Sequence, residues 1–311
     1  MTVTKKTIHE AIADVAEYLT ARKEGTIQSL KTGQKKLDRN LLGGIEWNST
    51  VTIGGRPSVG KSAYSDILVE GTFENNFDIN GKIDHDLLDF NWELSSRVML
   101  IRRLSAKLKQ TYKHIISAEE DKPLTDRELE QIVELLTEHY GNLPITFCEE
   151  PLTVKQFGDT VKKHIDETKR KTLIRVDHTL LARLAGEGSQ VQMLLNLMME
   201  ANAIKKGYPA IFLFLTQINR EFEERQKDGT FEAYPKQGDV YGGDASAMFS
   251  ETILLLNKPS KYGVGYYGKR PNGITVEPDD LFAHIVKNRN AEGDLIIHYK
   301  ENFKHMSMNE F

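Results

Sequence analysis

The feature that most constrains this chain is a run of eight residues, 55–62, with the sequence Gly-Arg-Pro-Ser-Val-Gly-Lys-Ser. It matches the spacing G-x-x-x-x-G-K-[ST] of a phosphate-binding loop. The apolar residues 50–54 before the run favour a strand, and residues 63–69 after it favour the start of a helix. A chance glycine-rich turn would not need this strand–loop–helix context, which the motif requires. The sequence therefore predicts a bound nucleoside triphosphate.

Each position of this loop has an expected role in holding the phosphates. Backbone N–H groups of the loop approach the phosphate oxygens, and the positive end of the following helix favours their charge. The Lys61 ammonium reaches the β- and γ-phosphates, and the Ser62 hydroxyl is a ligand of Mg²⁺. The predicted nucleotide-binding residues are Gly55, Arg56, Pro57, Ser58, Val59, Gly60, Lys61 and Ser62.

Composition and charge narrow the class of protein. With 311 residues, of which 39% are hydrophobic and 28% charged, the chain can form one large α/β domain or two smaller ones. The net charge of −4 argues against a surface coated in basic residues. It still permits nucleic acid in a narrow, locally basic channel.

Three features predict a cytoplasmic protein that does not enter the membrane. The single cysteine, Cys148, excludes an intramolecular disulfide framework and fits a reducing compartment. Residues 1–6 carry no apolar signal segment. The longest apolar run, near residues 210–215, is far too short to cross a bilayer.

From Leu37 onward, short apolar strands alternate with amphipathic helices, which predicts a mainly parallel sheet with helices on both faces. The expected strands are residues 50–53, 88–92, 145–148, 173–176, 210–215 and 252–256. The expected helices are residues 63–74, 97–110, 126–139, 154–168 and 190–206. Residues 281–287 and 295–300 favour a C-terminal β-hairpin, and the polar residues 70–86 predict an exposed excursion.

The N-terminal residues predict an isolated amphipathic helix. Thr7 and Glu10 have the spacing of a capping box at its start, and Gly25 is suited to its end. An apolar stripe follows one face of this helix: Ile8, Ile12, Val15 and Leu19. The stripe either packs on the helix's own domain or docks on a neighbouring subunit, and the pattern alone favours neither.

Three polar residues close predicted strands, at the edge where parallel sheets bind ligands. Asp177 is the best candidate for the acidic residue of the Mg²⁺ site, with a turn-capping aspartate as the alternative. Glu93 can orient or deprotonate an attacking water, although a solvated glutamate fits its position equally well. Gln217 follows the most hydrophobic strand, and its amide can both donate and accept hydrogen bonds near the γ-phosphate.

Two cations, Lys287 and Arg289, lie near the tip of the predicted hairpin. One residue apart in an extended strand, they are expected to point to the same side. There they can neutralise transition-state charge on a nucleotide of their own subunit or of the next one. An ordinary solvated hairpin is the alternative.

The order of these motifs resembles the motor domain of the DnaB-type replicative DNA helicases, which are hexameric RecA-like ATPases. Residues 30–38 are similar to the family's T-G-x-x-x-L-D segment, and the phosphate loop has the family's R-P-S-x-G-K-[ST] form. The other matching segments are residues 91–95 for S-L-E-M, 176–178 for the Walker B strand, 215–220 for L-S-Q-L-N-R and 287–290 for K-x-R-N. The resemblance covers nearly the whole chain.

The resemblance implies a RecA-like P-loop fold and an ATP-dependent helicase or translocase. Such a protein moves on single-stranded DNA as a hexameric ring, with ATP and Mg²⁺ as cofactors. Catalytic roles are implied for Lys61, Glu93 and Gln217 of one subunit, and for Lys287 and Arg289, which reach the neighbour's γ-phosphate. Residues 1–28 would form a protruding linker helix that docks on a neighbouring subunit, and residues 29–311 the ATPase domain.

Two departures concern partners. The family's larger N-terminal domain, which forms a collar and contacts primase, has no counterpart in this sequence, so coupling to primase or to a helicase loader is left open. Residues 238–244 align with a DNA-contacting pore loop, but Tyr241 stands where an arginine is expected. Tyr241 either packs or stacks on bases, and Lys236, Gly242 and Gly243 are the other predicted DNA contacts.

A third departure is His178, which replaces a tyrosine and which we interpret as a change in packing. Two other functions also fit parts of the sequence. A RecA-like recombinase or loader ATPase that forms filaments agrees with residues 30–38 and 241–243, but less well with the phosphate loop and residues 287–290. A regulatory, non-motor ATPase scaffold agrees with Tyr241, but less well with intact Lys61, Asp177 and Glu93.

Overall fold

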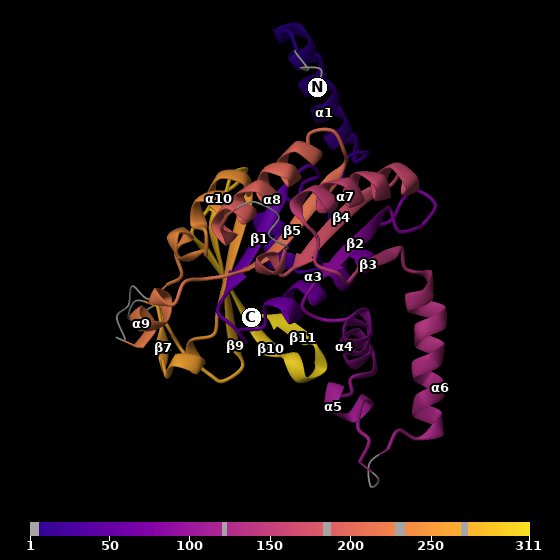
Figure 1. Cartoon of the computed structure of the whole chain (residues 1–311), viewed down its shortest axis with the longest axis vertical. Coiled ribbons are helices and arrows are strands. Elements are labelled where there is room, and N and C mark those ends of the chain that lie inside the picture. The colour runs from indigo at the N-terminus through magenta and orange to yellow at the C-terminus, as the bar shows by residue number, and fades with distance from the viewer. Residues whose placement is uncertain (1–5, 120–122, 183–187, 228–233, 269–272) are drawn as a thin grey trace.

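The predicted strands lie in one nine-stranded sheet, ordered β11-β10-β9-β6-β1-β5-β4-β2-β3 in the computed structural model (Figure 1). The structure describes residues 6–119, 123–182, 188–227, 234–268 and 273–311. The parallel strands are β1 (Thr50–Gly55), β2 (His85–Asn91), β3 (Ile145–Cys148), β4 (Lys171–Asp177), β5 (Ala210–Gln217) and β6 (Thr252–Asn257). Their carboxyl ends meet at one edge, where the residues after β1, β2, β4 and β5 form the candidate site.

The C-terminal part of the sheet is antiparallel, as the predicted hairpin requires. β9 (Asp280–Asn288) pairs with β6 and with β10 (Leu295–Asn302). The sequence did not predict β11 (Ser307–Glu310), an edge strand that pairs only with β10 among the described residues. Two short strands, β7 (Tyr266–Tyr267) and β8 (Ile274–Thr275), form a separate ribbon within the expected loop 258–280.

Helices cover both faces of the sheet, and β5 shows how the sequence divides them. Ile211, Leu213 and Leu215 join the core beneath α3, whereas the alternate residues Phe212 and Phe214 join the core beneath α7 and α8. The long helices are α3 (Lys61–Asn75), α4 (Ser96–Leu108), α6 (Asp126–Glu134, continued by a π-helical turn at Leu135–His139), α7 (Val154–Thr168) and α8 (Gln190–Ile204). The short ones are α2 (Lys35–Asn40), α5 (Tyr112–Ile115), α9 (Glu221–Lys227) and α10 (Gly243–Phe249). The predicted RecA-like arrangement is therefore confirmed.

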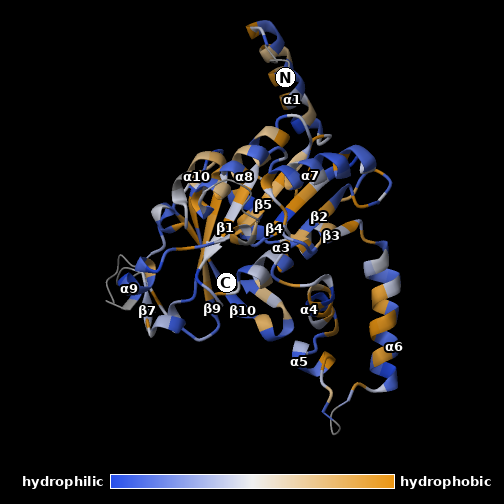
Figure 2. Cartoon of the chain, viewed as in Figure 1, coloured by the Kyte–Doolittle hydropathy of each residue, from blue (hydrophilic) through white to orange (hydrophobic). Residues whose placement is uncertain are grey.

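The N-terminal helix α1 (Ile8–Glu24) stands away from the sheet, with apolar residues along it (Figures 1 and 2). Both halves of the capping box between Thr7 and Glu10 are formed, and Gly25 ends the helix with a φ of 75°. The predicted apolar stripe is open to solvent, since its four side chains are 57–69% exposed. None of the α1 residues is buried, so the fold of this one chain leaves the stripe uncovered.

Two segments are more ordered than their polar sequence predicts. Residues 26–40 do not form a free linker, because Leu30 pairs with Ile45 and the Asp38 carboxylate accepts from the Thr32 hydroxyl at 2.8 Å. The expected exposed excursion 70–86 is wrong in extent: only residues 77–82 are exposed, while α3 runs to Asn75 and β2 begins at His85. No helix among the described residues has the length and apolarity to span a membrane.

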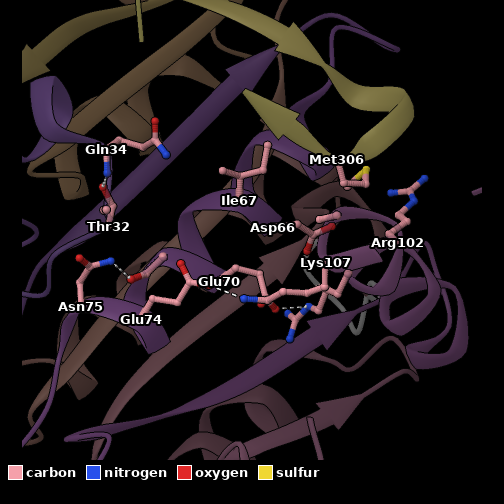
Figure 3. A pocket seen from close by; sticks show the side chains of 14 residues that line it. Thr32, Gln34, Asp66, Ile67, Glu70, Glu74, Asn75, Arg102, Lys107 and Met306 are labelled. Atoms are coloured by element: carbon pink, nitrogen blue, oxygen red, sulfur yellow. Dashed lines mark hydrogen bonds and ion pairs between the residues drawn. The ribbon is translucent and has the colours of Figure 1, made fainter. Parts of the chain in front are cut away.

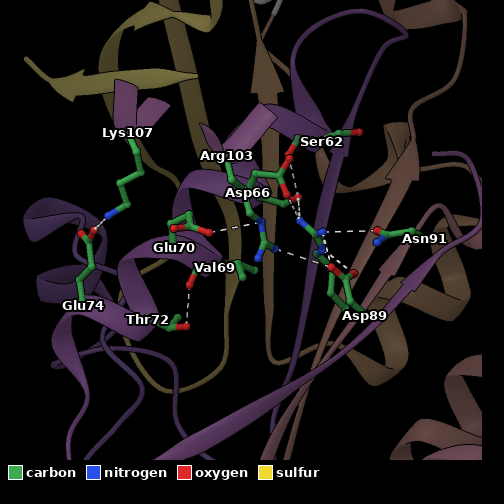
Figure 4. Close-up of polar contacts among 12 residues, drawn as sticks. Ser62, Asp66, Val69, Glu70, Thr72, Glu74, Asp89, Asn91, Arg103 and Lys107 are labelled. Carbon is green, nitrogen blue, oxygen red and sulfur yellow. Dashed lines mark hydrogen bonds and ion pairs between the residues drawn. The ribbon is translucent and has the colours of Figure 1, made fainter. Parts of the chain in front are cut away.

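A buried ionic cluster holds together the elements that lead into the candidate site (Figure 4). Arg175 of β4 donates to Asp89 of β2 through Nε at 2.8 Å and Nη2 at 2.5 Å, and it also donates to Asp66 of α3. All three side chains are at most 3% exposed. Arg103 of α4 joins the cluster at 3.2 Å from Glu70. The cluster thus fixes α3, β2 and β4 relative to one another.

Candidate nucleotide site

The phosphate loop has the predicted geometry. β1 ends at Gly55, α3 begins at Lys61, and residues 56–60 connect them. Gly60, the residue before α3, has a φ of 101°, and a Cβ there would overlap the ring of Phe303. Glycine is therefore required at this position both for the backbone conformation and for the close approach of Phe303.

The Lys61 side chain lies back along the loop. Its Nζ donates to the carbonyl oxygens of Gly55, at 3.0 Å, and of Arg56, at 3.3 Å. Burial lowers the pKa of Lys61 to about 8, against the opposing influence of the Asp177 and Glu93 carboxylates. The ammonium is therefore held in a poorly solvated position, where a phosphate would strongly favour its charged form.

Ser62 and Asp177 meet at the carboxyl edge of the sheet. Asp177, the last residue of β4, is 2% exposed, and the Ser62 side chain is hydrogen-bonded to its carboxylate. Burial raises the pKa of Asp177, which this hydrogen bond opposes. A hydroxyl and one carboxylate fit Mg²⁺, which takes oxygen ligands and relies on phosphates and waters for the rest. Among the described residues no cluster of three or more histidine, cysteine or acidic side chains offers an all-protein metal cage.

A pocket of about 630 Å³ brings the predicted catalytic residues together. Lys61, Ser62, Glu93 and Gln217 line it, although 156 positions separate the first of them from the last. They are contributed by the ends of β1, β2 and β5, which are neighbours through β4 in the sheet. The structure thus places these four predicted residues around one cavity.

His178 also lines this pocket, which corrects its interpretation as a change in packing alone. The amide nitrogen of Gln217 lies 2.9 Å from His178 Nε2, and the Leu180 backbone N–H donates to His178 Nδ1 at 3.2 Å. Burial lowers the pKa of His178, so its ring is neutral at pH 7. The sequence signal was available, because His178 directly follows Asp177 at the end of β4.

Arg56 is the one charged residue of the loop whose side chain leaves the pocket. Its Nε donates to Glu223 Oε1 at 2.7 Å, and its Nη1 donates to the carbonyl oxygen of Ile218 at 2.8 Å. Arg56 is absent from the pocket lining, whereas its neighbours Pro57 and Ser58 are present. Its predicted part in nucleotide binding is therefore confined to its backbone in this structure.

Lys287 and Arg289 lie on one side of their strand, as predicted, but at the opposite edge of the sheet from the pocket. Lys287 Nζ donates to the carbonyl oxygen of Ala247, and Arg289 Nη1 lies 3.4 Å from Glu251 Oε1. Glu251 in turn accepts from the backbone N–H of Thr50, the first residue of β1. The whole of β1, about 17 Å of extended chain, separates these cations from their own phosphate loop.

The predicted DNA-contacting residues follow β5 and lie near the pocket. The Tyr241 backbone N–H donates to the carbonyl oxygen of Gln217 at 2.9 Å, and Ile218 pairs with Val240. Lys236 is exposed, while Tyr241, Gly242 and Gly243 are half-buried. The Tyr241 hydroxyl is 3.4 Å from Gln190 Oε1, so the ring lies beside α8 with part of its surface open.

Three residues of the pocket wall had no role in the sequence interpretation: Arg102, Phe303 and Met306. Arg102 is on α4, nine residues after Glu93, and its helical position could have suggested this direction. Phe303 and Met306 belong to the connection between β10 and β11, which has no recognisable motif. They form the part of the wall contributed by the C-terminal residues.

A second cavity, of about 290 Å³, adjoins the first and shares Arg102 and Met306 with it (Figure 3). Its charged side chains largely pair with one another, since Lys107 donates to Glu74 and Arg103 lies beside Glu70. Positive and negative groups are therefore balanced within it. We assign no ligand to this cavity.

Comparison with known proteins identifies the family. Residues 29–307 match the model of the DnaB-like helicase C terminal domain. Among solved structures, the ATPase domain of a DnaB-like helicase superposes with a TM-score of 0.79 at 16% identity, covering 98% of this chain and 99% of that one. A DnaB-like replicative helicase, solved in a study of its interactions with primase, gives 0.77 at 15% identity, covering 98% of this chain and 67% of that one.

A more distant likeness extends to a KaiC-like protein, PH0186 from Pyrococcus horikoshii OT3, with a TM-score of 0.56 at 13% identity over 92% of this chain and 99% of that one. No curated protein sequence matches the chain. At these identities the structural likenesses establish the fold, and the family model establishes the relationship over most of the length. The chain belongs to the family of DnaB-like helicase C-terminal domains.

Proposed function

We propose that this chain is an ATP-driven translocase on single-stranded DNA that works as a ring of about six copies. The observation that carries the proposal is the position of Lys287 and Arg289. The pocket holds the phosphate loop, Glu93 and Gln217, yet these two cations lie beyond the far end of β1. A site whose cations cannot come from its own chain is completed by a neighbouring one.

Within one subunit, the pocket residues divide the chemistry among them. Ser62 and Asp177 would hold Mg²⁺, which when bound neutralises charge on the β- and γ-phosphates. Lys61 would exchange its contacts with loop carbonyls for contacts with phosphate oxygens. Glu93 would orient the attacking water and accept its proton, while Gln217 would position that water or the γ-phosphate.

The neighbouring subunit would supply Lys287 and Arg289. Positive charge aimed at the transferring phosphoryl group stabilises the transition state by about 10³–10⁵ in rate. Both side chains lie on one side of β9, so they would enter a neighbour's pocket together. Their present contacts are to two backbone carbonyls and to Glu251, which a phosphate can replace.

The exposed stripe of α1 would make a second contact between copies. Its four apolar side chains are all more than half exposed, and their spacing repeats along one helical face. Such a face is stabilised when it is buried against a partner. We therefore assign residues 1–28 to a linker helix that docks on the adjacent ATPase domain, residues 29–311.

DNA would bind along the residues that follow β5. Lys236 supplies a charge for the phosphate backbone, and the backbone N–H groups of Gly242 and Gly243 supply further donors. Tyr241 offers an aromatic surface on which a base can stack. Because the Tyr241 backbone is bonded to Gln217, a change in the nucleotide pocket would be transmitted to this loop.

One experiment tests the proposal as a whole: ATP hydrolysis with and without single-stranded DNA, at modest salt, alongside the native mass with ATP. We expect DNA to stimulate hydrolysis and the mass to correspond to a closed ring. Hydrolysis at full rate by a monomer, or no response to DNA, would contradict the proposal. Negative-stain images that show open filaments would instead support a RecA-like recombinase or loader.

A further inference from the structure

The side chain of Arg56 connects the phosphate loop to α9. Its two hydrogen bonds, to Glu223 at 2.7 Å and to the Ile218 carbonyl at 2.8 Å, leave it 12% exposed. Its backbone belongs to the loop that surrounds the phosphates. Any rearrangement of the loop backbone therefore displaces a cation that is bonded to α9.

The other end of this connection is Arg225, two residues further along α9. Its Nη1 and Nη2 donate to the two carboxylate oxygens of Asp239, at 2.8 and 2.6 Å. Residues two apart on a helix do not share a face. Glu223 therefore reaches toward the phosphate loop while Arg225 reaches toward the residues before Tyr241.

Asp239 sets the conformation of the turn that leads into the predicted DNA loop. Its carboxylate also accepts from the Lys236 backbone N–H at 2.7 Å, and its carbonyl oxygen accepts from the Asn219 N–H at 2.7 Å. The carboxylate is largely buried, with 8% of the side chain exposed. Movement of Arg225 would thus shift the turn directly before Tyr241.

The helix between these two ion pairs is held in place by packing. Phe222 is 1% exposed and lies in one apolar cluster with Ile218, Val240 and Leu255. Because protein interiors are closely packed, α9 would move as a unit with these neighbours. A displacement at Glu223 would then be passed on to Arg225.

We propose that Glu223 and Arg225 are positioning residues that couple the nucleotide state of the phosphate loop to the DNA loop. This inference rests on the proposed function, and it adds a route that is separate from the backbone bond between Gln217 and Tyr241. Energetic coupling between two binding sites is reciprocal. The same two ion pairs therefore govern how DNA alters hydrolysis and how nucleotide alters DNA affinity.

The test compares Glu223→Ala and Arg225→Ala with a matched control. The control is Glu200→Ala, which breaks the Lys162–Glu200 ion pair of 2.6 Å between α7 and α8. We expect both α9 variants to keep the basal ATPase rate but to lose stimulation by single-stranded DNA about three- to tenfold. The nucleotide-dependent change in oligonucleotide affinity, measured by fluorescence anisotropy, should shrink by the same factor. Glu200→Ala should match the wild type.

A conservative variant separates coupling from folding. Glu223→Gln keeps an acceptor for Arg56 but removes the charge, and it should retain more stimulation than Glu223→Ala. Stimulation is a ratio within one preparation, so a partly unfolded sample does not mimic the effect. Stimulation equal to wild type in both α9 variants, or equal losses with and without DNA, would overturn the inference. A wild type that does not respond to DNA would overturn the proposed function, and this inference with it.

Discussion

Arg175 of β4 and Asp89 of β2 form a two-pronged ion pair, with N–O distances of 2.8 and 2.5 Å, inside the sheet. Arg175 lies two residues before Asp177, and Asp89 lies four residues before Glu93. The pair therefore joins the strand that carries the Mg²⁺ residue to the strand that carries the candidate catalytic base. Asp66 of α3 extends the same contact to the helix that begins at the phosphate loop.

Replacing this arginine with an apolar residue should be strongly destabilising. Arg175→Met leaves two buried carboxylates without their partner, which costs about 3–5 kcal/mol in the free energy of unfolding. The measurement is urea denaturation, compared with the triple variant that replaces Asp66, Arg175 and Asp89 by apolar residues. The triple variant should recover much of the loss, because it leaves no buried charge unpaired. A loss below about 1 kcal/mol for Arg175→Met would show that the cluster is not structural.

Nucleotide binding should depend on the protonation of Lys61. Its pKa is lowered to about 8 by burial, so the free protein loses the ammonium charge as the pH rises through 8. A bound phosphate favours the charged form, and affinity should therefore fall by up to about tenfold per pH unit above 8. Fluorescent ATP titrations between pH 7 and pH 9.5 measure this. Lys61→Met should bind weakly at every pH, without this dependence, and a flat wild-type profile would refute the assignment.

The exposed stripe of α1 should be needed for assembly and not for the fold of the single chain. Ile12→Glu and Leu19→Glu place charges on residues that are 58% and 59% exposed, where they cost the isolated chain little. We expect the double variant to lose the oligomer in native mass measurements while its thermal melting stays close to that of the monomeric wild type. Glu17→Lys, a change of charge on the same helix but outside the stripe, is the control. An intact oligomer in the double variant would exclude this contact.

The sequence predicted those features that depend on local pattern. The phosphate loop, the alternating faces of β5 and the capping box of α1 each follow from residues close together in the chain. The direction of the Arg56 side chain could not be predicted in this way, because its partner Glu223 lies 167 positions away. The same holds for Phe303, which reaches Gly60 only because β10 folds back beside β9.

Two misjudged segments have a common physical cause. Residues 26–40 and 70–86 are polar, but several of their side chains form specific hydrogen bonds with one another. Asn76, for example, accepts from the Lys31 backbone N–H at 2.9 Å and donates to its carbonyl oxygen at 2.8 Å. Buried polar groups of this kind are satisfied by partners distant in sequence, which hydropathy patterns do not reveal.

The most direct test of the account is to mix two inactive variants. Lys61→Ala removes the phosphate-loop cation, and Arg289→Ala removes the cation proposed to act on the neighbour's nucleotide. In an equal mixture, about a quarter of the interfaces in a ring would join an intact Lys61 to an intact Arg289. We predict that each variant alone is nearly inactive in ATP hydrolysis and that mixing restores a substantial part of the rate. No restoration in mixed oligomers, or a wild-type rate for Arg289→Ala alone, would contradict a site shared between subunits.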